Sequence, residues 1–170
     1  SYVSSRKGDT IADHALRSAL IGLPNVKKYS FLDRGSDERQ YCAPGIDLPL
    51  CAFSRSKNYP EYHTNKDNFD LVTQEGLMGS FKVMKDIIDA LEIGIYPKTT
   101  TLAEPSLSKK GLYSTISQKG KHDDARKLRM NLIAHSDGKT NIFKIAELLN
   151  ISLNNLCEEY NILKSKKVLK

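Results

Sequence analysis

The sequence of 170 residues contains no tryptophan, and aromatic residues make up only 8% of it. It has no apolar run of about 18 residues, so the sequence predicts no transmembrane helix, and it shows no signal peptide. The three cysteines, Cys42, Cys51 and Cys157, are odd in number and lack C-x-x-C spacing. They are interpreted as reduced, mostly buried thiols of a cytoplasmic protein. None of the histidines stands in an H-E-x-x-H arrangement.

The charge is present but unevenly spread. Hydrophobic residues at 39% and charged residues at 27% are typical of a globular chain. The net charge is +6, and residues 126–170 hold nine Lys/Arg against four Asp/Glu, so +5. This basic end makes nucleic acid a partner to consider. The alternative is that Lys164, Lys166, Lys167 and Lys170 form a solvated terminus.

The apolar pattern predicts an α/β arrangement in residues 1–93. Asp9 is the predicted cap of a helix from Thr10 to about Ile21, and strands are expected over Val26–Leu32 and Leu48–Phe53. A long helix is predicted from about Phe69 to Leu91. Its large apolar residues recur every three or four positions, which predicts that they pack in the core: Leu77, Phe81, Met84, Ile88 and Leu91.

Residues 94–122 have no strong period and are interpreted as an extended linker that packs on the first domain. Residues 123–170 are predicted to form a winged-helix domain, with helices over about 124–134, 142–149 and 153–162. The last of these is the candidate reading helix and offers Asn154, Asn155, Glu158 and Glu159. Because two acids on a reading face repel phosphate, a protein partner is favoured over DNA, and DNA binding is expected to be weak and non-specific.

Two polar loops flank the predicted strand Leu48–Phe53. The first is Gly35–Tyr41 and the second contains Glu61–Thr64 and Asp67. If both face the same mouth of a sheet, His63 is a candidate metal ligand or general base. The alternatives remain open at this point: a lone loop histidine is more often a surface residue, and Asp37 with Glu38 can be a solvated acidic pair beside Arg39.

Three motifs resemble those of a known family. They are Gly-Ser-Asp-Glu-Arg-Gln-Tyr-Cys at 35–42, Pro-Glu-Tyr-His-Thr at 60–64, and Glu-Pro-x-Leu-x-Lys-x-Gly-Leu-Tyr near 104–113. The chain resembles aminopeptidase-like proteins of an uncharacterised-domain type, often encoded in bacterial polysaccharide clusters and similar to two-metal zinc aminopeptidases. The resemblance runs over nearly all 170 residues and includes a closing winged helix.

The resemblance implies a zinc-dependent hydrolase acting on a peptide or amide-like substrate. It implies that His63 is the last zinc ligand and that Thr64 and Asp67 hold its loop. The predicted lining of the site consists of Ser36, Asp37, Glu38, Arg39 and Tyr62. The family's other metal ligands come earlier, so the chain is expected to be the C-terminal part of a longer protein, to need that upstream part as its partner, and to be inactive alone.

One position departs from the family pattern. The tyrosine that assists the reacting carbonyl is replaced by Asp33, which puts that role in doubt. The alternative function is a non-catalytic binding protein that acts on a protein partner or DNA through residues 123–170.

Overall fold

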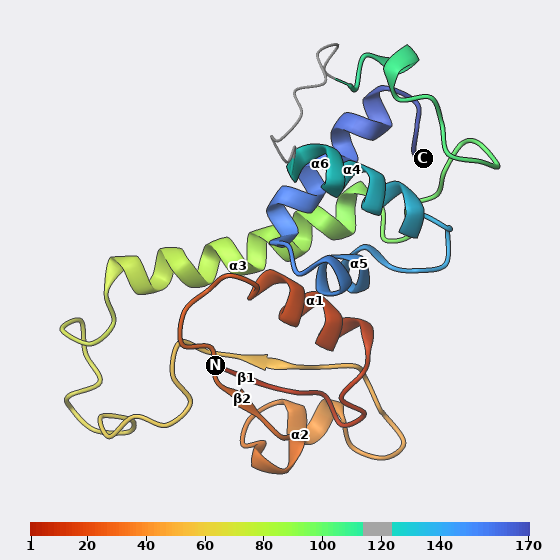
Figure 1. Cartoon of the computed structure of the whole chain (residues 1–170). Helices are drawn as coiled ribbons and strands as arrows, with labels where there is room; N and C mark the ends of the chain where they lie inside the picture. Colours follow the sequence, from red (N-terminus) through yellow and green to blue (C-terminus); the bar gives the residue numbers. More distant parts are fainter. Residues whose placement is uncertain (114–123) are drawn as a thin grey trace. The chain divides into compact units, whose positions relative to one another are not determined.

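The computed structural model describes residues 1–113 and 124–170, and the chain divides into two compact units. The first unit is Ser1–Asp89 and combines a small sheet with helices (Figure 1). The second unit is Ala90–Lys170 and is mainly helical. No helix in the described part of the chain is long and apolar enough to cross a membrane.

A three-stranded sheet lies at the centre of the first unit, in the order β2-β1-β3. The central strand β1 (Tyr2–Val3) runs parallel to β2 (Lys28–Tyr29) and antiparallel to β3 (Ala52–Phe53). Both β2 and β3 lie inside predicted strands but are shorter than predicted. Two features shorten them: Ser30 caps a 3-10 turn, η1 (Phe31–Asp33), and Pro49 lacks the N–H that a sheet ladder needs.

Helix α1 (Ile11–Ala19) begins one residue later than a cap at Asp9 would place it. Thr10 is the N-cap and forms a capping box with Asp13: each side chain bonds to the other's backbone N–H. The predicted helix is therefore confirmed, and the predicted cap is wrong. Thr10 rather than Asp9 caps the helix because the side chains of Thr10 and Asp13 each accept the other's backbone N–H group.

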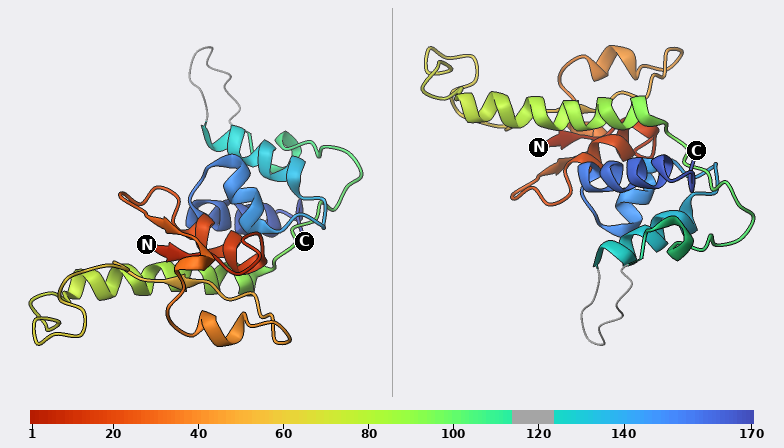
Figure 2. Two further views of the ribbon diagram at one scale, coloured as in Figure 1. Left: turned by 90° about the horizontal axis from the view of Figure 1, so that it is seen from below. Right: turned by 90° about the horizontal axis from the view of Figure 1, so that it is seen from above.

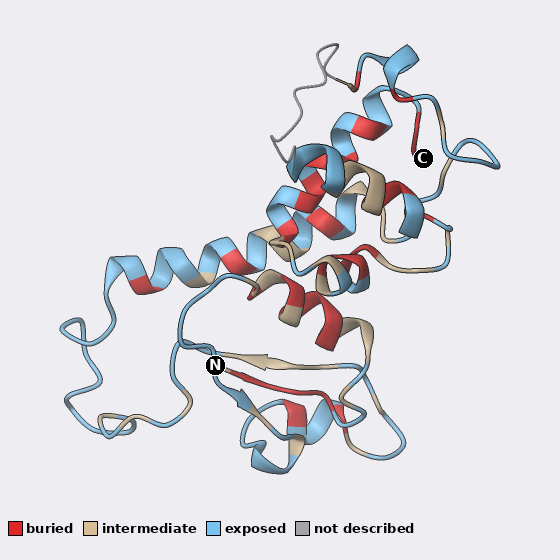
Figure 3. Ribbon diagram, viewed as in Figure 1, coloured by how far each residue is buried: buried red, intermediate tan, exposed pale blue. Residues whose placement is uncertain are grey.

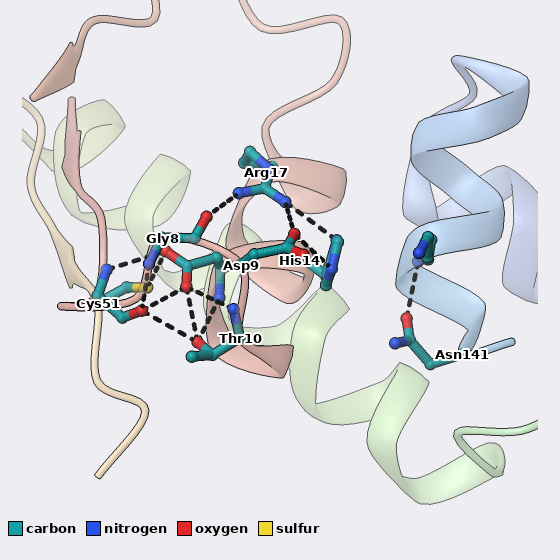
Figure 4. A network of polar contacts seen from close by, with 10 residues as sticks. Gly8, Asp9, Thr10, His14, Arg17, Cys51 and Asn141 are labelled. Carbon is teal, nitrogen blue, oxygen red and sulfur yellow. Dashed lines mark hydrogen bonds and ion pairs between the residues drawn. The ribbon is translucent and has the colours of Figure 1, made fainter. Parts of the chain in front are cut away.

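The carboxylate of Asp13 is fully buried and collects donors from three segments. It accepts the Ser5 N–H at 2.9 Å and the Ser5 hydroxyl at 2.5 Å, and the Thr10 hydroxyl at 2.7 Å. The Cys51 thiol, next to β3, donates to it at 3.2 Å. Figure 4 shows this network with Thr10 and Cys51 labelled. Burial alone raises the pKa of Asp13, but these hydrogen bonds outweigh it and hold the pKa well below its usual value.

The long helix α3 (Gln74–Ile93) turns a different row of residues inward than predicted. The expected core residues are all exposed, from 42% at Leu91 to 61% at Phe81. The buried or half-buried row lies one residue earlier at each step and consists of Gly76, Ser80, Val83, Ile87 and Ala90. Figure 3 shows the exposed stretches of this helix in pale blue. The prediction that Leu77, Phe81 and Met84 pack in the core of this chain is therefore wrong.

The second unit contains the three helices that the sequence predicts. They are α4 (Asp124–His135), α5 (Ile142–Leu149) and α6 (Leu153–Ser165). The Asn141 side chain caps α5 and the Ser152 side chain caps α6, each by accepting a backbone N–H of the first turn. The core of the unit is formed by apolar residues from all three helices, including Leu132, Phe143 and Leu156.

The segment 94–113 belongs to the second unit rather than packing on the first domain as predicted. Its backbone pairs with both later extended pieces: Lys98 with Asp137 and Thr99 with Leu169, both antiparallel. After the short 3-10 helix η2 (Ser108–Lys110), Leu112 is buried together with Leu107. The segment is ordered here because it supplies the strand that joins two otherwise unpaired extended pieces.

Candidate functional site

The loop that carries His63 is a compact series of turns directly after β3. His63 has φ +61°, in the left-handed region that non-glycine residues seldom occupy. Its ring stacks on Tyr62 with centroids 3.9 Å apart. Thr64 closes the turn, because both its N–H (3.0 Å) and its hydroxyl (2.7 Å) donate to the Glu61 carbonyl. In the described part of the chain, no hydrogen bond or ion pair engages the His63 ring.

Tyr59 braces the same loop across its base. Its hydroxyl donates to Asp67 Oδ2 at 2.9 Å, and its ring meets Tyr62 edge-on at 5.6 Å. The hydrogen bond to Asp67 raises the pKa of Tyr59 above its usual value. The backbone N–H of Asp67 also reaches the Thr64 carbonyl at 3.2 Å. The loop therefore holds an exposed imidazole on a backbone that its own side chains fix.

The first predicted loop, Gly35–Tyr41, mixes exposed and buried positions. Ser36, Asp37 and Arg39 are exposed, and Asp37 stands at the start of the one-turn helix α2 (Glu38–Tyr41). Glu38 turns inward, is only 2% exposed, and accepts the Gly35 N–H at 2.9 Å. Burial raises the pKa of Glu38, but bonds from backbone N–H groups outweigh it, and the pKa lies below its usual value. Glu38 thus fixes the loop instead of facing solvent.

The structure does not bring the two loops together. Because β2 is parallel to β1 and β3 is antiparallel to it, the segment that leaves β2 and enters β3 lies at one end of these strands, and the segment that leaves β3 lies at the other. Figures 1 and 2 show α2 and the loop around residue 63 apart in every view. The expectation that both loops face one mouth is therefore wrong for this chain, since a loop before a strand and a loop after it begin at different ends.

A cleft of about 500 Å³ lies between the His63 loop and the first turns of α3. Tyr59 and Asp67 line it from the loop, and Arg55 lines it from the segment after β3. His63 is not among its lining residues. Within residues 1–113 and 124–170, no three His, Cys, Asp or Glu side chains are grouped closely enough to hold a metal ion.

The exposed face of α6 is the second candidate surface. It presents Asn154, Asn155, Glu158 and Asn161, and the carboxylate of Glu158 accepts a bond from Asn154 at 2.8 Å. Glu159 does not belong to this face, because it is buried and paired with Arg129 of α4. The prediction of two acids on the reading face is therefore wrong, and one remains.

Two residues with clear structural roles escaped the sequence reasoning. Tyr59 was missed because it lies outside the motif Pro60–Thr64 and because a spacing of eight residues from Asp67 matches no known pattern. Arg129 on α4 could have been suspected only as a partner for an acid, since a helix pattern does not say which acid of another helix it meets.

The comparisons with known proteins agree with the division of the chain. Residues 1–94, more than half of the chain, match the family described as domain of unknown function DUF4910. The chain belongs to this family. Residues 94–170 match a winged helix-turn-helix family, which confirms the predicted winged helix in a DUF4910 protein with an α/β first unit.

Two relatives come from Clostridium acetobutylicum. A protein named "Putative polysaccharide biosynthesis protein with aminopeptidase-like domain" is 30% identical over 149 residues, which is 86% of this chain and 34% of that protein. Its name supports the predicted relationship to aminopeptidase-like proteins. A crystal structure of a "putative peptidase" matches 99% of this chain and 38% of its own, with a TM-score of 0.77 and 24% identity, and so shares the fold. This DUF4910 chain spans about a third of the length of the curated relative it matches.

Proposed function

We propose that this chain is the C-terminal portion of a zinc-dependent aminopeptidase-like hydrolase and that His63 is one of its zinc ligands. The observation that carries the proposal is the loop Tyr59–Asp67, which holds an exposed imidazole on a left-handed backbone, with no hydrogen bond to its ring from the described residues. A residue held in a sparsely populated conformation by its surroundings is typical of a functional position. The aminopeptidase-like domain in the name of the 30% identical relative supports the same chemistry.

The side chains of this chain can supply part of the ligand set of such a zinc site, but not all of it. His63 offers a ring nitrogen, the usual type of zinc ligand. Asp67 already accepts the Tyr59 hydroxyl, so it orients the ligand loop, and Tyr62 holds the plane of the imidazole by stacking. When bound, zinc polarises the substrate carbonyl and lowers the pKa of a water molecule. The remaining ligands and the base would come from a longer protein, and the substrate would be a peptide or similar amide.

The test measures the zinc content of the full-length natural protein. His63→Ala should remove about one equivalent of zinc, because a four-coordinate site is greatly weakened by the loss of one ligand. His135→Ala is the matched control, since His135 is also exposed but lies at the end of α4. Elemental analysis that finds equal zinc in the wild type and in His63→Ala would disprove the assignment.

The second unit supports a different candidate function, binding of DNA through α6. The favouring observation is that Glu159 points into the core, so the exposed face of α6 keeps three asparagines and one acid. Asparagine is a common base-edge contact in the major groove. The unit Ala90–Lys170 also holds fourteen Lys/Arg against eight Asp/Glu, so it carries +6, whereas the first unit is neutral overall.

This binding is expected to be weak and mainly electrostatic. Fluorescence anisotropy with a 20-base-pair duplex should show affinity falling by roughly 10³-fold between about 50 and 200 mM salt. Asn155→Ala should change that affinity little, because non-specific binding uses phosphate contacts rather than base edges. A sequence-selective complex that survives physiological salt and is lost in Asn155→Ala would instead make the protein a regulator. If no duplex binds even at 50 mM salt, a protein partner remains as the role of this unit.

The structure forms no disulfide among Cys42, Cys51 and Cys157, and Cys42 and Cys157 are buried. The reduced state of these thiols is part of the proposal. A cytoplasmic location, proposed on the same ground, would be tested by fractionation of the source cells.

A further inference from the structure

Helix α3 has two apolar rows, and only one of them is covered. The inner row consists of Gly76, Ser80, Val83, Ile87 and Ala90, of which Val83 and Ile87 pack in the small core of the first unit. The outer row is defined here as Leu77, Phe81, Met84 and Ile88, which are 59%, 61%, 47% and 52% exposed. Each outer residue follows an inner one directly, so the outer row lies about 100° further round the helix axis.

The outer row is distinct from the charged side of this helix. The charged side is a third arc, where Lys82 pairs with Asp86 at 3.8 Å and Lys85 pairs with Asp89. Apolar residues therefore occupy the two adjoining arcs, about half of the circumference. A surface helix has one apolar stripe, whereas a helix that is apolar over a wider arc is packed between two layers. The sequence of α3 is thus suited to a second covering layer.

The rest of the first unit also leaves many of its hydrophobic residues uncovered. Among the described residues, seven buried hydrophobic residues fall in Ser1–Asp89 and sixteen in Ala90–Lys170. Exposed large hydrophobics show the reverse distribution, with fifteen in the first unit and five in the second. Phe69 and Met78, close to the outer row in sequence, are 90% and 56% exposed. Neighbouring exposed apolar side chains, as on α3, mark an interaction surface.

We propose that the outer row of α3 is the buried interface with a further part of a longer natural protein, which packs an apolar face of its own against Leu77, Phe81, Met84 and Ile88. This rests on the part of the proposed function that makes the chain a portion of a longer hydrolase, and it does not depend on zinc. The relatives support this occupant, because 99% of this chain matches only 38% of the solved structure. About three fifths of that fold is therefore available to cover the helix.

A second copy of the chain is a poorer occupant. Four side chains, each about half exposed, offer about 400 Å², whereas a stable interface between separate proteins buries about 800 Å² on each partner. Two parts of one polypeptide can pack with a smaller buried area, because the linked parts lose little additional translational freedom when they pack.

The experiment places the photo-crosslinking residue p-benzoylphenylalanine at position 81 in the full-length natural protein, with the same residue at Lys82 as the matched control on the charged arc. Mass spectrometry should map crosslinks from position 81 to residues outside Ser1–Lys170 of the same molecule, and at least tenfold fewer from position 82. Crosslinks between two copies would overturn the proposal in favour of a dimer. The proposal also fails if position 81 gives no more crosslinks than position 82.

A second measurement compares Phe81→Lys in two contexts. In the 170-residue chain, where Phe81 is exposed, the substitution should leave thermal stability unchanged and reduce binding of an apolar dye. In the full-length protein it should lower thermal stability, because a charge would then be buried, and Phe81→Leu should retain most of it. Equal effects in both contexts would refute the interface. Both measurements are made with a chelator present, so a failed zinc assignment and a failed interface are distinguishable.

Discussion

The ion pair between Arg129 and Glu159 should be the most sensitive polar contact of the second unit. Arg129 Nε donates to Glu159 Oε1 at 2.5 Å and its Nη2 to Oε2 at 3.3 Å, while Nη1 donates to the Leu112 carbonyl at 2.5 Å. The Glu159 side chain is 7% exposed and that of Arg129 is 15%. The pair therefore joins α4, α6 and the segment before α4 almost out of contact with water.

Replacing Arg129 with methionine keeps most of the apolar stem and leaves the carboxylate of Glu159 buried without its partner. Removal of one member of a buried pair costs about 3–5 kcal/mol, and we expect the lower value because Arg129 is still reached by solvent. About 3 kcal/mol corresponds to a roughly hundredfold larger population of the opened state of this unit. Glu159→Gln should cost about 1 kcal/mol, since the guanidinium can turn outward.

Hydrogen exchange is the suitable assay, because it reports each unit separately and a chain of two units need not unfold in one step. Amides of α4 and α6 should exchange roughly a hundredfold faster in Arg129→Met, while those of α1 stay unchanged. Lys127→Met is the matched control, with the same loss of charge at an exposed position of α4.

The double variant Arg129→Met with Glu159→Leu should recover most of the lost protection, because apolar residues of similar size replace a buried pair with little loss. The reasoning is refuted if Arg129→Met accelerates exchange less than threefold, or if the double variant is as unprotected as the single one.

Three further predictions follow from other contacts. Asp13→Asn should destabilise the first unit by about 2 kcal/mol near neutral pH. The folded pKa of Asp13 lies below the unfolded value of about 3.9, so its stabilisation is complete above that pH and is lost as the pH falls further. Acid titration monitored by circular dichroism should therefore show a shallower loss of stability in the variant. Burial and, after it, the hydrogen bond to Asp13 raise the pKa of Cys51 to about 12. Iodoacetamide at pH 8 should therefore label Cys51 far more slowly than an unfolded thiol, and faster in Asp13→Asn. Equal labelling rates of folded and unfolded Cys51 would contradict this. The 170-residue chain supplied with zinc should leave aminoacyl anilides intact, and turnover that a chelator and His63→Ala both abolish would show that its catalytic set is complete.

Local signals were enough to predict most helices. The predicted range 142–149 agrees with α5, and α6 begins at residue 153 as predicted; in the structure Asn141 and Ser152 cap these helices. The short strands were harder, because two paired residues have no period of their own. Their ends depend on Ser30 and Pro49, which interrupt apolar runs that otherwise favour longer strands.

Which side of a helix faces inward could not be read from the period of α3. Both of its apolar rows have the same three-and-four spacing, and the larger side chains of Phe81 and Met84 favoured the wrong one. The inner row is built around Gly76 and Ala90, whose small size allows close approach but gives a weak hydrophobic signal. Tertiary packing decides such cases, and the spacing of residues along the chain does not reveal it.

The candidate site was predictable in parts. The motif around His63 was found from the sequence, and the structure adds the Tyr59 brace that no spacing rule indicates. The placement of Asp37 beside His63 failed, because their distance along the chain says nothing about which end of the strands each loop leaves. Glu159 failed for a similar reason: three residues after the buried Leu156, it lies on the inner side of α6.

The pairing of residues 98–100 with residues 168–170 has a consequence for biosynthesis. The Lys98 N–H donates to the Lys170 carbonyl at 3.0 Å, and the Lys170 N–H donates back to Lys98 at 2.9 Å. The first extended piece of the second unit therefore waits for its partner until some seventy later residues have been translated. During that interval, the ribosome-bound chain exposes an unpaired strand edge of the kind that chaperones recognise and that invites misassembly between neighbouring nascent chains. This edge is thus closed only after residues 168–170 have been made and have paired with residues 98–100.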